Sequence, residues 1–254
     1  MLLIDCHDPA CLTNPITSKK LSNFTAYNSR FRMPSQESGG VLNMHYSFNY
    51  GNIHFISVDA ETGYAGAPEE THYVLPCGGF GDQLIWLEKD LMKANSERDV
   101  RPWIFAAGHH PMYQGDSIDS SLQKAMEDLF YKYGVDVYFS GHVHSYERDL
   151  PVYKGVPEQS YVNPRATTHI LVGGAGNDEM SGIQLDRSKD PSPQTRVESG
   201  GNGAWTAVTD VDNHVGIGKV TIVDDSTLKF DYIRTMTGEV FDSITLTRKH
   251  TPMK

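Results

Sequence analysis

Gly108-His109-His110-Pro111 and Gly141-His142-Val143-His144 are the two runs that decide the fold of this 254-residue chain. Each follows a short apolar run, at residues 103–107 and 135–140, of the kind that forms a strand buried on both faces of a sheet. The stretch between them has a helical pattern, so together they predict a β-α-β unit. Both histidine clusters then lie just beyond the carboxyl ends of strands, where α/β sheets bind their ligands.

The spacing of the histidines favours a metal site. Side chains at positions i and i+2 of an extended segment leave the same face, so His142 and His144 can point into one cavity. They are too close in sequence to converge easily on one small ion but are well placed to serve two, and two-metal hydrolases hold their ions about 3.5–4 Å apart. A lone histidine is more often a core or surface residue, whereas three in two strand-end motifs favour metal binding.

The rest of the chain predicts a single α/β domain. Its expected parts are an irregular lead-in at 1–40, an α/β core with the metal motifs at 41–176, an exposed loop at 177–203 and a β-rich C-terminal region at 204–250. Further expected elements are a strand at 53–59, a helix at 82–94, a helix capped within 116–121, a strand at 168–173, and an antiparallel closing sheet from 204–210, 217–223, 227–234 and 240–247. Isolated histidines are expected to be structural or exposed: His7, His45, His54, His72, His169, His214 and His250.

The net charge of the chain is −10, from 22 basic and 32 acidic residues. This balance argues against a nucleic-acid partner, because binding to a phosphate backbone depends on Lys and Arg. No run approaches the roughly 20 apolar residues of a membrane span, so no membrane partner is expected. An acidic protein that handles phosphate needs positive charge locally, and metal ions supply it. The sequence does not indicate an oligomeric state.

Several segments resemble the purple acid phosphatases, a branch of the calcineurin-like metallophosphoesterases. The stretch 102–113 is similar to the segment that carries one ligand of the divalent metal, and 139–148 is similar to the family's GHxH-x-YER segment. Residues 27–34 and 46–55 match the middle region of the family, and 220–246 resembles its β-rich C-terminal region. The likeness therefore runs through most of the chain.

The resemblance implies an incomplete αββα metallophosphoesterase sandwich of mixed sheets with a β-rich C-terminal closing region. It also implies an acid phosphatase that hydrolyses small phosphate monoesters at a dinuclear centre of Fe(III) and a divalent ion (Zn, Fe or Mn). The family's expected location is secreted, vacuolar or lysosomal, although this chain begins without a signal peptide. A sequon at Asn23-Phe24-Thr25 agrees with a secreted glycoprotein.

The resemblance assigns roles to four histidines. It matches His109 and His142 to ligands of the divalent metal and His144 to a ligand of the ferric ion. His110 follows the first ligand, where it could reach the substrate as a catalytic group or simply pack beside the site.

Residues around these histidines are expected to support them. Tyr146, Glu147 and Arg148 match a family segment that orients metal ligands or forms structural pairs. Asp116 and Asp119 lie in the loop after His110 and are expected to be turn and helix-cap residues, because Asp favours both roles.

Three upstream motifs of the family do not occur in this sequence: Asp-x-Gly, Gly-Asp-x-x-Tyr, and Gly-Asn-His followed by Glu or Asp. In the family they supply two aspartates, a tyrosinate, an asparagine and a histidine. We therefore expect an N-terminally truncated, C-terminal part of such a phosphatase, which carries the histidine-rich half of the site and holds at most one divalent ion weakly. Two other interpretations stay open: a catalytically incompetent fragment or interaction remnant, and a parent that is a phosphodiesterase or nucleotide pyrophosphatase.

Overall fold

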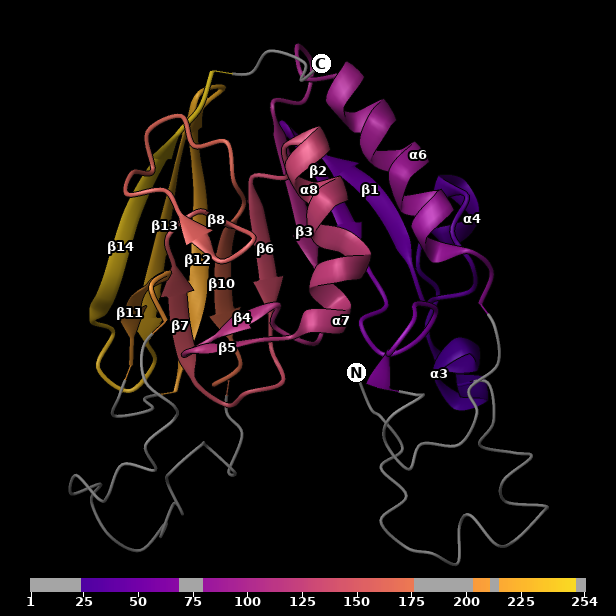
Figure 1. Ribbon diagram of the computed structural model, residues 1–254, viewed down its shortest axis with the longest axis horizontal. Coiled ribbons are helices and arrows are strands. Elements are labelled where there is room, and N and C mark those ends of the chain that lie inside the picture. Colours follow the sequence, from indigo (N-terminus) through magenta and orange to yellow (C-terminus); the bar gives the residue numbers. More distant parts are fainter. Residues whose placement is uncertain (1–23, 69–79, 176–202, 211–214, 250–254) are drawn as a thin grey trace, which may run out of the picture.

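Helices, a seven-stranded mixed sheet and a three-stranded antiparallel sheet lie in three layers in the computed structural model, which describes residues 24–68, 80–175, 203–210 and 215–249 (Figure 1). The helices are α3 (Thr25–Arg30), α4 (Ser35–Ser38), α6 (Gln83–Ser96), α7 (Ser120–Leu122), the π-helical turn η2 (Gln123–Glu127) and α8 (Asp128–Tyr133). The strands are β1 (Tyr46–Tyr50), β2 (Ile53–Ser57), β3 (Trp103–Ala107), β4 (Tyr113–Gln114), β5 (Ser117–Ile118), β6 (Val137–Ser140), β7 (Tyr146–Asp149), β8 (Val152–Tyr153), β9 (Val156–Pro157), β10 (Thr168–Val172), β11 (Thr206–Thr209), β12 (Gly216–Asp224), β13 (Thr227–Arg234) and β14 (Val240–Thr247). No helix among the described residues is long and apolar enough to cross a membrane.

The large sheet has the strand order β1-β2-β3-β6-β10-β7-β11. Its four central strands, β2, β3, β6 and β10, are parallel to one another, while β1, β7 and β11 each pair antiparallel with their neighbours. The segment α7–η2–α8 connects β3 to β6, so the predicted β-α-β unit is confirmed. The α/β fold class is confirmed with it.

Alternating side chains of β3 fill two separate cores. Trp103 and Phe105 pack between the two sheets, together with Tyr232 of the three-stranded sheet. Ile104 and Ala106 point the other way, into the core between the large sheet and the helices. The predicted burial of this strand on both faces follows from this arrangement, because helices cover one face and a second sheet covers the other.

The helix α6 forms where the leucine spacing predicts it. Asp82 caps its first turn by accepting a hydrogen bond from the backbone N–H of Ile85 at 3.0 Å, which satisfies one of the free donors of a helix start. Leu87 and Leu91 are fully buried against the large sheet. The next helix is interrupted by the π-helical turn η2, which the apolar spacing does not reveal.

Two expectations about boundaries differ from the structure. Part of the lead-in predicted as irregular forms the short helices α3 and α4, which tertiary contacts hold: Asn43 accepts from the backbone N–H of Met33 at 2.7 Å and donates to Phe31 at 2.6 Å. The segment 204–210 was expected in the closing sheet, but β11 joins the large sheet beside β7. An alternating pattern of apolar and polar residues predicts a strand but does not indicate which strand it pairs with. The predicted loop at 177–203 lies almost wholly outside the described residues.

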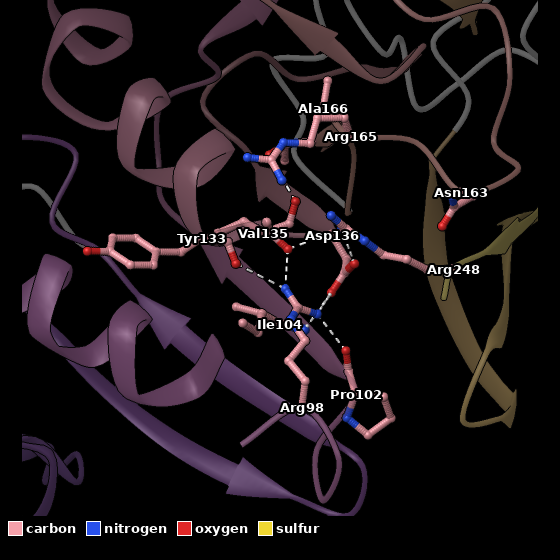
Figure 2. Close-up of polar contacts among 12 residues, drawn as sticks. Arg98, Pro102, Ile104, Tyr133, Val135, Asp136, Asn163, Arg165, Ala166 and Arg248 are labelled. Atoms are coloured by element: carbon pink, nitrogen blue, oxygen red, sulfur yellow. Dashed lines mark hydrogen bonds and ion pairs between the residues drawn. The ribbon is translucent and has the colours of Figure 1, made fainter. Parts of the chain in front are cut away.

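A buried ion network ties the start of β6 to two other parts of the chain (Figure 2). The Asp136 carboxylate accepts hydrogen bonds from the Arg98 guanidinium at 2.9 Å, from Arg248 and from the backbone N–H of Ile104 at 2.7 Å. Arg98 also donates to the carbonyl oxygens of Pro102 and Gly134. The network links the segment after α6, the β3–β6 pair and the end of β14, with its side chains almost completely excluded from solvent.

Asp136→Asn should lower the free energy of unfolding by about 3–5 kcal/mol, because it leaves two buried guanidinium groups without a counter-charge. Urea unfolding of the purified chain measures the change. Glu88→Gln is the matched control: it removes a carboxylate from an exposed pair with Lys132 and should change stability little. A loss for the Asp136 variant no larger than that of the control would contradict a structural role for the network.

His169 is a buried core residue of β10, as the sequence predicts. Its ring lies 4.9 Å from the ring of Tyr113 and 5.6 Å from that of Tyr138, measured between centroids. Neither ring nitrogen has a hydrogen-bond partner among the described residues. Burial without a partner lowers the pKa of His169 to about 3, so the folded protein keeps this ring neutral well into the acidic range.

Acid should therefore destabilise the fold through His169. Between about pH 6.5 and pH 3 the unfolded chain binds a proton at this ring and the folded chain does not, so stability is lost as the pH falls below 6.5 and the loss reaches about 2 kcal/mol by pH 5. His169→Phe removes the titrating group and should reduce the difference in unfolding free energy between pH 7.5 and pH 5 by that amount. Urea titrations at both pH values measure this difference. If it is the same in the variant as in the natural protein, His169 is not the cause of the acid destabilisation.

Candidate metal centre

The loops that leave β3 and β6 are hydrogen-bonded to each other. The backbone N–H of Gly108 donates to the carbonyl of Phe139 at 3.0 Å, and that of Gly141 donates to the carbonyl of His109 at 2.9 Å. The two strands thus continue in parallel for one more step beyond the sheet. This pairing places the residues that follow them, His109 and His142, at the same edge.

Three histidine side chains gather at this edge. Nε2 of His109 lies 3.3 Å from Nδ1 of His142, and the rings of His110 and His142 are 4.0 Å apart between centroids. The potential ligand atoms of all three residues lie within 4.8 Å of one another. His109 and His110 are half-buried and His142 is exposed, so the cluster is open to solvent on one side.

The backbone of His142 is held in an unusual conformation. Its φ is +66°, in the left-handed region that non-glycine residues occupy at a cost of about 1–2 kcal/mol. The loop that carries it packs tightly against Gly173, whose missing Cβ would lie 1.8 Å from the carbonyl oxygen of Val143. Strain that surrounding structure imposes on a single residue is typical of functional sites, so the conformation supports a role for His142.

The electrostatics of the cluster favour neutral imidazoles. Loss of hydration, together with the nearby His110 and His109, lowers the pKa of His142 to about 4. Loss of hydration also lowers the pKa of His109. Neutral imidazole is the form that binds metal ions, and Zn²⁺, Fe²⁺ and Mn²⁺ all accept nitrogen ligands in proteins. The donor set therefore fits a divalent ion.

His144, which the resemblance matches to the ferric site, lies outside this group of three within the described part of the chain. It occupies a half-buried position two residues after His142. His110, which could reach the substrate or simply pack beside the site, lies within the cluster. The structure therefore brings together two of the three predicted ligands and the predicted catalytic histidine.

The Tyr-Glu-Arg segment in β7 holds the surrounding structure together. Tyr146 donates to the Asp242 carboxylate of β14 at 2.5 Å, and Arg148 donates to both of its oxygens at 2.6 and 2.9 Å, which ties the two sheets. Glu147 accepts from the backbone N–H of Gly115 at 2.8 Å and so fixes the loop that follows the first histidine motif.

The acidic residues of that loop have the structural roles that the sequence predicts for them. Asp119 caps α7 by accepting from the backbone N–H groups of Ser121 and Leu122, each at 3.0 Å. Asp116 is exposed. The predicted glycosylation site at Asn23 lies outside the described residues.

Sequence reasoning missed one residue of the centre, Glu61. Its carboxylate oxygen Oε1 lies 3.2 Å from Nε2 of His110 and 3.9 Å from Nε2 of His109, and the side chain is only 5% exposed. Burial raises the pKa of Glu61, but contact with His110 and the charges of the other histidines outweigh this effect, so the net pKa is lowered. One feature of the sequence could have identified Glu61: it is an acidic residue shortly after the strand β2, which is parallel to β3.

Comparisons with known proteins agree with this geometry. The chain matches the calcineurin-like phosphoesterase family over residues 7–146 and the family described as iron/zinc purple acid phosphatase-like protein C over residues 166–243. It is 36% identical to an acid phosphatase of Aspergillus ficuum, over 88% of this chain and 41% of that protein. It is 38% identical to human acid phosphatase type 7, over 66% of this chain and 40% of that protein.

Solved structures show the same fold. A purple acid phosphatase from yellow lupin (Lupinus luteus) seeds superposes with a TM-score of 0.65 at 23% identity, over 88% of this chain and 35% of that one. A Plasmodium protein described as an anchor in the inner membrane complex superposes with a TM-score of 0.53 at 17% identity, over 81% of this chain and 54% of that one. The chain thus spans about two fifths of the length of the acid phosphatases from Aspergillus and human. By its sequence and its fold, the chain belongs to the calcineurin-like phosphoesterase family, in the purple acid phosphatase branch.

Proposed function

We propose that this chain carries the histidine-rich half of a dinuclear metal centre that hydrolyses phosphate monoesters. The observation that supports this most directly is the convergence of His109 and His142, whose ring nitrogens lie 3.3 Å apart at the carboxyl ends of two parallel strands. His144, two residues further on, is the proposed ligand of a second, ferric ion. The relatives named as acid phosphatases support the choice of reaction.

The chain's own residues contribute position and charge to such a centre. His109, His110 and His142 offer neutral nitrogen donors on loops that backbone hydrogen bonds hold together. The Tyr138 hydroxyl donates to the carbonyl oxygen of His110 at 2.8 Å and so restrains the loop that carries His110. When bound, a divalent ion would polarise the phosphoryl group as a Lewis acid and neutralise its negative charge. That charge is needed locally because the chain as a whole is acidic.

The location of the protein is part of the same proposal. A vacuolar or lysosomal protein, or one secreted into an acidic medium, would work at acidic pH. A free histidine with an ordinary pKa near 6.5 would be protonated there and unable to bind metal. The lowered pKa values of His109 and His142 suit such a compartment.

His142→Ala and His144→Ala should each lower metal-dependent hydrolysis of para-nitrophenyl phosphate by about 100-fold or more. Each substitution removes a nitrogen ligand of the centre. The assay uses the longest form of the protein that its own gene encodes, at about pH 5.5. His54→Gln is the matched control: it removes an imidazole that instead contacts Asp90 and Asn49 and should leave turnover nearly unchanged.

Three outcomes would contradict the proposal. Near-normal turnover in either variant would remove that histidine from the ligand set. No turnover in the natural form would favour a non-catalytic remnant. Faster hydrolysis of bis(para-nitrophenyl) phosphate than of the monoester would favour a phosphodiesterase, since the fold does not fix the chemistry.

A further inference from the structure

Glu61 brings a carboxylate to the histidine cluster from a third strand. β2, β3 and β6 lie side by side and parallel, so the residues that follow them meet at one edge of the sheet. Glu61 follows β2, as His109 follows β3 and His142 follows β6. The cluster is thus built by three neighbouring strand ends, and each end contributes a potential metal donor.

The loop that carries Glu61 is rigidly held. Asp59 accepts from the backbone N–H groups of Glu61 at 2.9 Å and Thr62 at 3.1 Å, which closes a tight turn. Gln83 accepts from the backbone N–H of Asp59 at 2.6 Å and donates to its carbonyl at 2.9 Å. Glu61 is therefore placed by the fold rather than by a flexible surface loop, as a metal ligand requires.

The charged neighbours of the buried Glu61 carboxylate are histidines of the cluster, which lower its pKa overall. Its Oε1 is buried and makes no hydrogen bond of normal geometry with the described residues. An ionised carboxylate that loses water without gaining a partner is strongly disfavoured, so buried charges in proteins are paired or coordinate metals. The closest ion-pair contact that the described residues give Oε1 is with Nε2 of His110, at 3.2 Å.

Two of the distances match those between ligands of one small ion. Ligands about 2.0–2.1 Å from a tetrahedral zinc ion lie about 3.3 Å from one another. The His109–His142 nitrogen pair is 3.3 Å apart and the Glu61–His110 pair is 3.2 Å apart. The Glu61–His109 pair is wider, at 3.9 Å, and Glu61 lies outside the group of three whose ligand atoms are all within 4.8 Å of one another, so its carboxylate has to move closer to His142 when the ion binds. Three histidines and one carboxylate are also donors that zinc uses in proteins.

We infer that Glu61 is the carboxylate ligand of a divalent-metal site in which His109, His110 and His142 supply the imidazoles. This set adds Glu61 and His110 to the divalent-metal ligands that the family resemblance implies, His109 and His142, and leaves His144 to the proposed second ion. The loop acids Asp116 and Asp119 are not needed, because one is exposed and the other caps a helix. The inference deepens the proposed function by naming ligands of the same centre, but it concerns metal binding by this chain alone.

Isothermal titration calorimetry of the 254-residue chain with zinc chloride tests the assignment. We expect one zinc ion per chain, and Glu61→Gln and His110→Ala should each weaken its binding by about tenfold or more. Asp116→Asn removes an acid from a loop beyond the first histidine motif and should leave the affinity unchanged. Thermal melting of each metal-free variant checks that it folds.

Several results would overturn the inference. These are the absence of zinc binding by the wild-type chain, an unchanged affinity in His110→Ala, and an unchanged affinity in Glu61→Gln, which would reduce Glu61 to an ion pair with His110. If Glu61→Gln does not fold, Glu61→Asp decides, because it keeps the charge but withdraws the carboxylate by one methylene: weaker zinc binding supports the assignment, and unchanged affinity overturns it. Phosphatase activity does not enter these measurements, so a failure of the proposed reaction and a failure of this ligand set are separate results.

Discussion

One buried carboxylate, that of Asp136, sets the register on which the rest of the structure depends. Its Oδ2 accepts from the backbone N–H of Ile104, while its own backbone N–H donates to the carbonyl of the same residue at 2.9 Å. Its backbone carbonyl accepts from Thr168 at 3.1 Å at the start of the next strand. A single residue therefore aligns the starts of β3, β6 and β10, and Arg98 and Arg248 neutralise its charge (Figure 2). Because side chains alternate along a strand, a slip of one residue here would turn every core side chain to the wrong face.

The candidate metal centre is the consequence of that register at the opposite ends of the same strands. Strands that start level and run parallel also end level, so the loops after β3 and β6 can hydrogen-bond to each other and bring His109 and His142 together. Glycines allow the tight approach: a Cβ on Gly108 would lie 2.4 Å from the Tyr138 hydroxyl. The space that a side chain would occupy at Gly108 is filled by Tyr138.

Much of the fold could be predicted from local pattern. Apolar runs at 103–107 and 135–140, the leucine spacing of α6 and the cap at Asp119 each predict an element that the structure contains, because periodicity and capping act within a few residues. The partner of β11 and the π-helical turn η2 could not be predicted in this way. The position of β11 is decided by its pairing with β7, which is distant in sequence, and the apolar spacing around η2 carries no signal of a π-helical turn.

The site was predicted less completely than the fold. His109 and His142 follow obvious strands and have a motif, so sequence reasoning identified them. Glu61 has no motif and looks like any acidic loop residue until the parallel pairing of β2 with β3 places it beside the histidines. The role of His110 could not be predicted either. A residue next to a ligand in the sequence can face toward the site or away from it.

The central claim is that three adjacent strand ends build one metal site. A crystal structure of the zinc-loaded chain, with an anomalous difference map recorded at the zinc edge, tests it most directly. We expect a single peak about 2.0–2.2 Å from nitrogens of His109, His110 and His142 and from an oxygen of Glu61. A peak elsewhere, or a peak at the histidines with the Glu61 carboxylate out of bonding distance, would contradict the claim.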